Sequence, residues 1–351
     1  ILTMIKYKRN MIAPVNLFFL LYVSRVIIGF TVSSSALKSR YSLDLVYSTF
    51  AALFITALVS LPAVISAVKG KSVMDNKILS TLYGLYFVFS GAVNIAKFAL
   101  FSSTELNQST KTAVLAGLMI IACAYAASLG VEAVSRFGSM VFVLTLLGII
   151  GVIAEGSGDF SYLNLFPVTQ NSGENIMMNI LFSVCSTNEL VLFIALAPKV
   201  NGKVVKPYYS SLAASYLTMM LLIGFTVGVL GDTASLSTYP LFQVSQLSKL
   251  GTGERLEAVF TALWIFAAFL KVTLFLYCAG ESFSYRNKTV KYIVCAAVMF
   301  GISTFMLYGS SFDSRQELVL YPAFALFAFV LPLLYLIFSR KKNGIEDKRN
   351  N

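Results

Sequence analysis

The chain has 351 residues, of which 57% are hydrophobic and only 12% are charged. Soluble domains carry about 25% charged residues, so this composition excludes a water-soluble fold and predicts an all-α integral membrane protein embedded in a lipid bilayer. The net charge of +11 would favour nucleic-acid binding in a soluble protein, but here it indicates basic loops on the cytoplasmic side, and we expect no nucleic-acid partner.

The sequence lacks the residue types on which many catalytic and metal sites depend. There is no histidine, which excludes Ser-His-Asp catalysis and histidine-ligated metals. No C-x-x-C spacing occurs, and the cysteines all lie in apolar runs, at Cys123, Cys185, Cys278 and Cys295. We therefore expect no enzyme activity, no metal and no cofactor.

Ten mostly apolar runs are long enough to cross a membrane, which takes about 20 residues. In chain order they cover residues 12–35, 43–66, 79–102, 112–130, 138–155, 176–198, 208–231, 256–280, 290–309 and 319–339. The first is too long for a signal-peptide core and has no small-residue cleavage site after it, so we interpret it as a retained span. The prediction is a single ten-helix membrane domain over 1–339 and a basic cytoplasmic tail over 340–351.

The loop charges and the number of spans predict an orientation and a repeat. With the N-terminus inside, 18 basic residues fall in cytoplasmic segments and six fall outside, which predicts that both termini are cytoplasmic. Ten spans divide into two oppositely oriented sets of five, as in many secondary transporters. We predict a 5+5 inverted repeat, with repeat one over 12–155, repeat two over 176–339, and a site at broken first and sixth helices.

Four charged residues lie inside the predicted spans and away from the span ends: Arg25, Lys97, Glu189 and Lys271. Each costs about 2.5–3.5 kcal/mol at a helix centre, and such residues usually face the bundle interior. Arg25, Glu189 and Lys271 lie near the middle of the first, sixth and eighth spans. Lys97 lies toward the outer end of the third span, where it could snorkel.

Polar residues interrupt the first and sixth spans at mid-depth, as SRVIIGFTVSSS from Ser24 and as CSTNE from Cys185. Ser, Thr and Asn can satisfy backbone groups that are freed where a helix unwinds, and paired breaks point to a substrate site. The candidate ligand-binding or coupling residues are Arg25, Gly29, Ser33, Ser186, Thr187, Asn188, Glu189 and Lys271. Secondary candidates are Asn94, Lys97, Trp264 and Tyr277.

Two interpretations of these charges stay open. Glu189 and Lys271 could form a buried ion pair that only holds the sixth and eighth spans together. Alternatively, the surplus positive charge forms a pocket for a carboxylate, such as that of an amino acid, with Glu189 available for proton coupling. In both cases we expect Lys271 to face the interior, bonded to Glu189, to backbone carbonyls or to both.

Several local patterns resemble the spore germination permease family, the B subunits of endospore germinant receptors, within the amino acid–polyamine–organocation superfamily. The segments are NLFPV (164–168), STNELVLFIALAPKV (186–200), VEAVSRFGSM (131–140) and, most specifically, YPLFQVSQL…GERLEAVFTALWIFAAFLKVTLFLY (239–277). The resemblance covers most of the chain and is densest from about 131 to 280. The first span departs from the family pattern by carrying Arg25, and Asn188 stands where the family often has an aromatic residue.

The resemblance implies a ten-helix inverted-repeat fold in a bacterial cell membrane, the spore inner membrane. It also implies a subunit that detects a small-molecule germinant, such as an amino acid, beside a larger A subunit and a lipoprotein C subunit. The alternative is a proton- or sodium-coupled amino acid transporter with the same fold. A cation channel is less favoured, because a single glutamate accompanies three basic residues at membrane depth.

Overall fold

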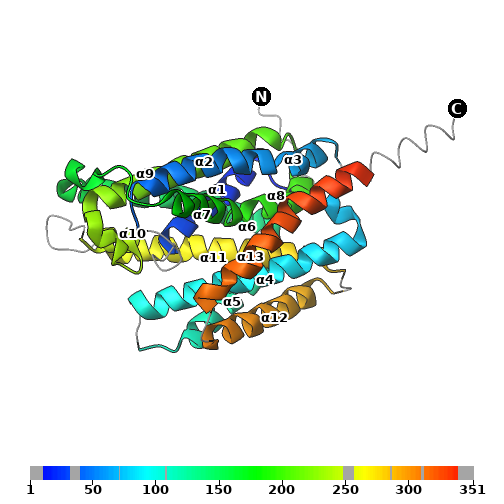
Figure 1. Cartoon of the computed structure of the whole chain (residues 1–351). Coiled ribbons are helices and arrows are strands. Elements are labelled where there is room, and N and C mark those ends of the chain that lie inside the picture. Colours follow the sequence, from blue (N-terminus) through cyan, green and yellow to red (C-terminus); the bar gives the residue numbers. More distant parts are fainter. Residues whose placement is uncertain are drawn as a thin grey trace, which may run out of the picture.

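The computed structural model describes residues 11–31, 40–70, 72–106, 109–247, 257–284, 287–309 and 312–338. Every named element within these ranges is helical, and most of the helices run lengthwise through the molecule (Figure 1). A helix satisfies all of its backbone groups internally, which a chain in hydrocarbon requires. The all-α class predicted from composition is therefore confirmed.

Each predicted span coincides with one helix or with one pair of helices. The bounds are α1 Pro14–Thr31, α2 Asp44–Val59, α3 Leu61–Val68, α4 Lys77–Phe101, α5 Thr112–Ser128, α6 Val131–Gly156, α7 Gly173–Cys185, α8 Glu189–Leu196, α9 Val205–Leu230, α10 Pro240–Leu247, α11 Glu257–Ser282, α12 Lys288–Tyr308 and α13 Phe312–Ala325. Seven helical segments of the described residues, with α7 and α8 counted together, are long and apolar enough to cross a membrane, and the bent pair α2–α3 makes an eighth. Two shorter apolar helices, α1 and α5, make the arrangement compatible with ten spans.

Local sequence explains where several of these helices begin. The side chain of Asn76 accepts hydrogen bonds from the backbone N–H groups of Ile78 and Leu79, and so caps α4. Ser172 caps α7 and Asn287 caps α12 in the same way. Such caps satisfy N–H groups that have no partner within the helix. Between α5 and α6, Gly130 adopts a φ of +92°, a conformation that favours glycine.

Two details of the spans differ from the sequence prediction. The first helix is not interrupted at Ser24 and Arg25, because α1 continues without a break to Thr31; the predicted Ser33 lies outside the described residues. The second span bends by 41° between α2 and α3. Pro62 lies in the first turn of α3, and a proline, which has no N–H, removes a helical hydrogen bond and favours such a bend.

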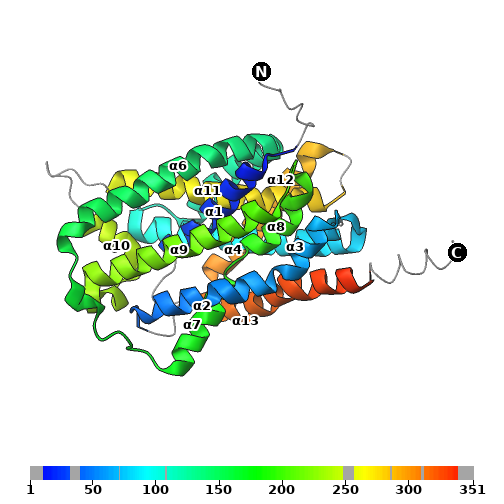
Figure 2. The same ribbon diagram turned by 90° about the horizontal axis from the view of Figure 1, so that it is seen from above.

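Equivalent helices of the two predicted halves pack against one another. The third span, α4, lies along the eighth, α11; the second, α2, lies along the seventh, α9; and the fourth, α5, lies along the ninth, α12. In an inverted repeat related by a pseudo-two-fold axis, helices that lie close to the axis pack against their equivalents in this way. The start of α1 and the end of the helix at 338 lie at the same end of the bundle as α3 (Figures 1 and 2). The repeat bounds remain a prediction.

Candidate functional site

The sixth predicted span is a broken helix, and Glu189 begins its second half. α7 ends at Cys185 and α8 begins at Glu189. The carbonyl of Ser183 accepts hydrogen bonds from the hydroxyls of Ser186 at 3.1 Å and Thr187 at 3.0 Å, which satisfies a backbone group freed by the break. The Glu189 carboxylate consequently stands at the N-terminus of α8, where the helix dipole favours an anion.

Arg25 approaches the same break from α1 and binds the C-terminal end of α7. Its guanidinium donates to the Ser183 carbonyl at 3.0 Å and to the Ser186 hydroxyl at 3.1 Å. The guanidinium carbon also lies 4.7 Å from the centre of the Tyr216 ring, a favourable cation–π distance. A cation at the C-terminus of α7 and an anion at the N-terminus of α8 match the partial charges that the break creates.

Lys271 connects its own helix, α11, with α1 and α8 through hydrogen bonds. Its Nζ donates to Glu189 Oε1 at 2.9 Å and to the backbone carbonyl of Ser24 at 2.9 Å. The Ser24 hydroxyl donates to the same Oε1 at 2.8 Å. We call Arg25, Glu189 and Lys271 the charged centre. All three are at most 4% exposed, and charges buried this deeply need both an opposite charge and hydrogen bonds.

The charged centre keeps unused hydrogen-bonding capacity. Arg25 Nε and Glu189 Oε2 are buried without a hydrogen-bond partner, although buried polar atoms normally have one. Both residues line a cavity of about 10 Å³, which has room for about one water molecule. A residue with an unpartnered donor and a residue with an unpartnered acceptor therefore border the same small space, in a cluster with one more positive than negative charge. A ligand as large as an amino acid would need this space to widen.

Two tyrosines extend the network from the break to other helices. The Tyr216 hydroxyl on α9 lies 2.7 Å from Thr187 Oγ1 and 2.9 Å from Thr56 Oγ1 on α2. The Tyr86 hydroxyl on α4 donates to Asn188 Oδ1 at 2.7 Å. Consequently, the three residues of the break, 186–188, are held from α1, α2, α4 and α9 together.

Four residues of the site were not predicted from the sequence, namely Tyr86, Tyr216, Thr56 and Ser24. All four are buried, and each makes a side-chain hydrogen bond to another helix. Their signal in the sequence is a hydroxyl inside an apolar span. That signal is weak, because the chain has 18 tyrosines and serine or threonine in a membrane helix often bonds only its own backbone.

The secondary candidate Trp264 lies in an aromatic cluster rather than in the charged centre. Its ring stacks on Phe98 with centroids 5.3 Å apart and lies 4.3 Å from the ring of Phe101. Phe101 in turn packs against Tyr239 and Phe242, near α10, with centroids 4.8 and 5.0 Å apart. We call these five residues the aromatic cluster. Trp264 precedes Lys271 by seven residues, about 10 Å along α11.

The remaining candidates also lie apart from the ion pair. Gly29 is a point of close packing, because a Cβ there would come within 2.6 Å of the Met219 sulfur. Asn94 bonds the Ser90 carbonyl of its own helix, Lys97 is half-buried on α4, and Tyr277 stacks on Tyr292. Within the part of the chain that the structure describes, no group of three His, Cys, Asp or Glu side chains could hold a metal ion.

Most of the chain matches a known protein family. Residues 44–316 match the model of the spore germination protein family. The chain belongs to this family. Spore germination protein KB of Bacillus subtilis (strain 168) is 28% identical over 221 residues, which are 60% of this chain and 59% of that protein. The match thus spans less than two thirds of the relative's length.

Two solved structures share the fold of this family member. One is a sodium-coupled sialic acid symporter in a substrate-bound outward-open state, with a TM-score of 0.60, 12% identity, and coverage of 92% of this chain and 80% of that one. The other is Mhp1, a nucleobase-cation-symport-1 family transporter, with a TM-score of 0.63, 14% identity, and coverage of 95% and 80%. Family and fold together make this chain a multi-pass membrane protein of the spore germination protein family with a transporter-like fold.

Proposed function

We propose that the chain is the permease-like subunit of a spore germinant receptor and recognises a small nutrient that carries a carboxylate, such as an amino acid. The observation that carries the proposal is the charged centre at the α7–α8 break. There, Arg25 Nε and Glu189 Oε2 are unpartnered beside a small cavity. Two buried cations and one carboxylate suit an anion, and the free Glu189 oxygen suits the ammonium group of the same ligand.

Family membership supports the sensing role over simple uptake. The relative is named a spore germination protein, and for this chain we propose that an A subunit and a lipoprotein C subunit assemble with it in the spore inner membrane. Basic residues at the end of the bundle where α1 begins, such as Lys69, Lys77 and Lys199, support a cytoplasmic location of that end.

Coupled transport of an amino acid is the second candidate, because both structural relatives are transporters. Uptake by the chain alone in proteoliposomes, driven by a proton or sodium gradient, would favour transport. A response that requires partner subunits would favour sensing. The same charged centre serves either role.

The experiment is ligand-dependent thermal stability of the purified protein against a panel of amino acids, sugars and nucleosides. Binding to the native state raises its stability by about 2.7 kcal/mol at a ligand concentration of 100 Kd. We expect one amino acid to raise the melting temperature and Glu189→Gln to abolish that shift. Glu174→Gln, an exposed change in the first turn of α7, is the matched control and should keep it.

Two results would contradict the proposal. A ligand shift of wild-type size in Glu189→Gln would remove the Glu189 charge from recognition. A shift with a sugar or nucleoside, and with none of the amino acids, would remove the carboxylate as the recognised group.

A further inference from the structure

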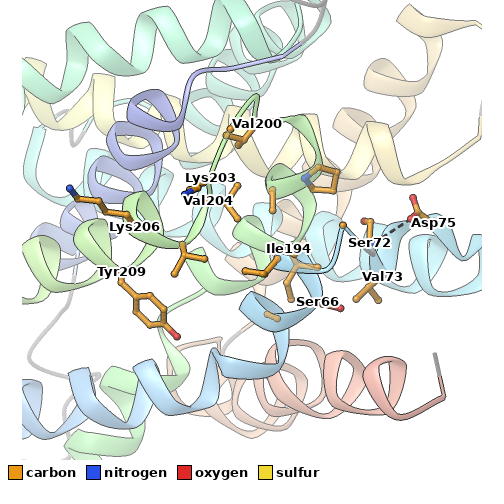
Figure 3. Close-up of a pocket in the computed structure, with 18 of the residues that line it drawn as sticks. Ser66, Ser72, Val73, Asp75, Ile194, Val200, Lys203, Val204, Lys206 and Tyr209 are labelled. Atoms are coloured by element: carbon orange, nitrogen blue, oxygen red, sulfur yellow. Dashed lines mark hydrogen bonds between the residues drawn. The ribbon is translucent and has the colours of Figure 1, made fainter. Parts of the chain in front are cut away.

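A large cavity of about 1090 Å³ lies at the end of the bundle where α3 and α8 end and α9 begins (Figure 3). Its lining includes none of Arg25, Glu189 and Lys271, so it is separate from the charged centre. Small and branched apolar side chains form much of its wall, among them Ala63, Ala67, Ile194, Val200 and Val204. The volume is at the upper limit of what small-molecule sites usually have.

The cavity also borders an exposed apolar face of α3. Leu61, Ile65 and Val68 are 44%, 42% and 63% exposed, and their spacing places them on one face of the helix. Val68 belongs both to this exposed apolar face and to the cavity wall. Val68 therefore connects the exposed apolar face of α3 with the wall of the cavity.

Positive charge gathers around the same cavity. The exposed side chains of Lys203 and Lys206 belong to its lining. The first turn of α9 also borders it, and Val204 leaves this helix start without a side-chain cap. The N–H groups of Val205 and Lys206 at the start of this 26-residue helix attract an anion, and the next residue, Pro207, has no N–H. The one acidic residue of the lining, Asp75, has its carboxylate bonded to the backbone N–H of Ser72.

A buried hydroxyl of the wall is unsatisfied. Ser66 on α3 is only 3% exposed, and its Oγ has no hydrogen-bond partner. It lines the cavity across from α9, near Val73 (Figure 3). A buried hydroxyl normally finds a partner, so Ser66 marks a position where a polar group of a bound molecule would be stabilised.

We infer that this cavity binds an anionic phospholipid from the leaflet at this end of the protein. The acyl chain enters beside Val68 and lies on the apolar wall, and the phosphate is bound by Lys203, Lys206 and the start of α9. Basic pockets between transmembrane helices bind anionic headgroups by this combination of charge and apolar contact. Because the site adjoins α8, whose first residue is Glu189, lipid occupancy would stabilise the position of this half of the broken helix.

The test is titration of delipidated, full-length protein with phosphatidylglycerol or phosphatidylcholine, followed by native mass spectrometry. We expect phosphatidylglycerol to bind at least tenfold more tightly than phosphatidylcholine. The double variant Lys203→Gln/Lys206→Gln should lose this preference, and Ala67→Phe, which fills the apolar part, should weaken binding of the lipid. The matched control is Lys69→Gln/Lys77→Gln, because both lysines are exposed at the same end but neither lines the cavity.

Glycerol 1-phosphate distinguishes a lipid from a free phosphate. It carries a glycerol-linked phosphate without the acyl chains, so it should not displace phosphatidylglycerol at millimolar concentration. Displacement would overturn the proposal in favour of a soluble phosphate ligand. An equal loss of binding in both lysine double variants would overturn it as well, since the lipid would then respond only to the general charge of this end.

Discussion

The charged centre and the aromatic cluster each include one residue of α11, Lys271 and Trp264, which lie about 10 Å apart along the helix, and the two regions are stabilised in opposite ways. The charged centre is built at a helix break, where hydrogen bonds from neighbouring helices position its side chains and the residues of the break. The aromatic cluster joins α4 and α11 with the region of α10 through ring contacts. Apolar packing tolerates substitutions of similar volume, whereas a buried charge depends on each partner. The charged centre should therefore be the more sensitive of the two regions.

The largest effect is expected from Lys271→Ala. The change leaves the Glu189 carboxylate buried without its counter-ion, and removing one partner of a buried pair typically costs about 3–5 kcal/mol. Lys97→Ala is the control, because Lys97 is only half-buried, and it should cost less than about 1 kcal/mol. Unfolding in detergent micelles measures both. Equal losses of unfolding free energy in the two variants would show that Lys271 contributes no more to stability than the half-buried Lys97.

A smaller effect is expected from Trp264→Leu in the aromatic cluster. Leucine keeps an apolar side chain but removes the ring contacts with Phe98 and Phe101, each worth about 0.5–1.5 kcal/mol. We therefore expect a loss of about 1–3 kcal/mol, with the ligand-induced rise in melting temperature retained. Trp264→Phe, which keeps a ring, should lose less. If Trp264→Leu is fully folded but its melting temperature does not rise with ligand, the aromatic cluster belongs to the ligand site.

Tyr216→Phe should have the smallest effect of the three. It keeps the ring beneath Arg25 and removes only the hydroxyl that contacts Thr56 and Thr187, which should cost about 1–2 kcal/mol. Tyr209→Phe is the control, because among the described residues the Tyr209 hydroxyl accepts only one long hydrogen bond, from Ser60 at 3.4 Å. If both variants melt at the same temperature, the link between α2 and the α7–α8 break contributes nothing to stability.

The parts of this structure that depend on local sequence could be predicted. Hydropathy located the spans because burial in a membrane needs a continuous apolar run. The contact between Lys271 and Glu189 followed from the energetic need of a buried charge for a partner. The bend at α2–α3 was missed although Pro62 signals it, and the partners of Arg25 were missed because Tyr216 and the Ser183 carbonyl come from other segments. The large cavity depends on how α3, α8 and α9 pack, which no single segment specifies.

The central claim is that the Glu189–Lys271 pair takes part in ligand recognition and does not only stabilise the packing of the helices. The most direct test is the double variant Lys271→Met/Glu189→Met, since replacing both members of a buried pair by apolar residues is often neutral or stabilising. The measurement is the melting temperature with and without the amino acid that most stabilises the wild type. We predict that the double variant melts close to the wild type without ligand but shows no ligand-induced rise. A double variant that folds equally well and keeps the full ligand-induced rise in melting temperature would show that the pair only stabilises the packing of the helices.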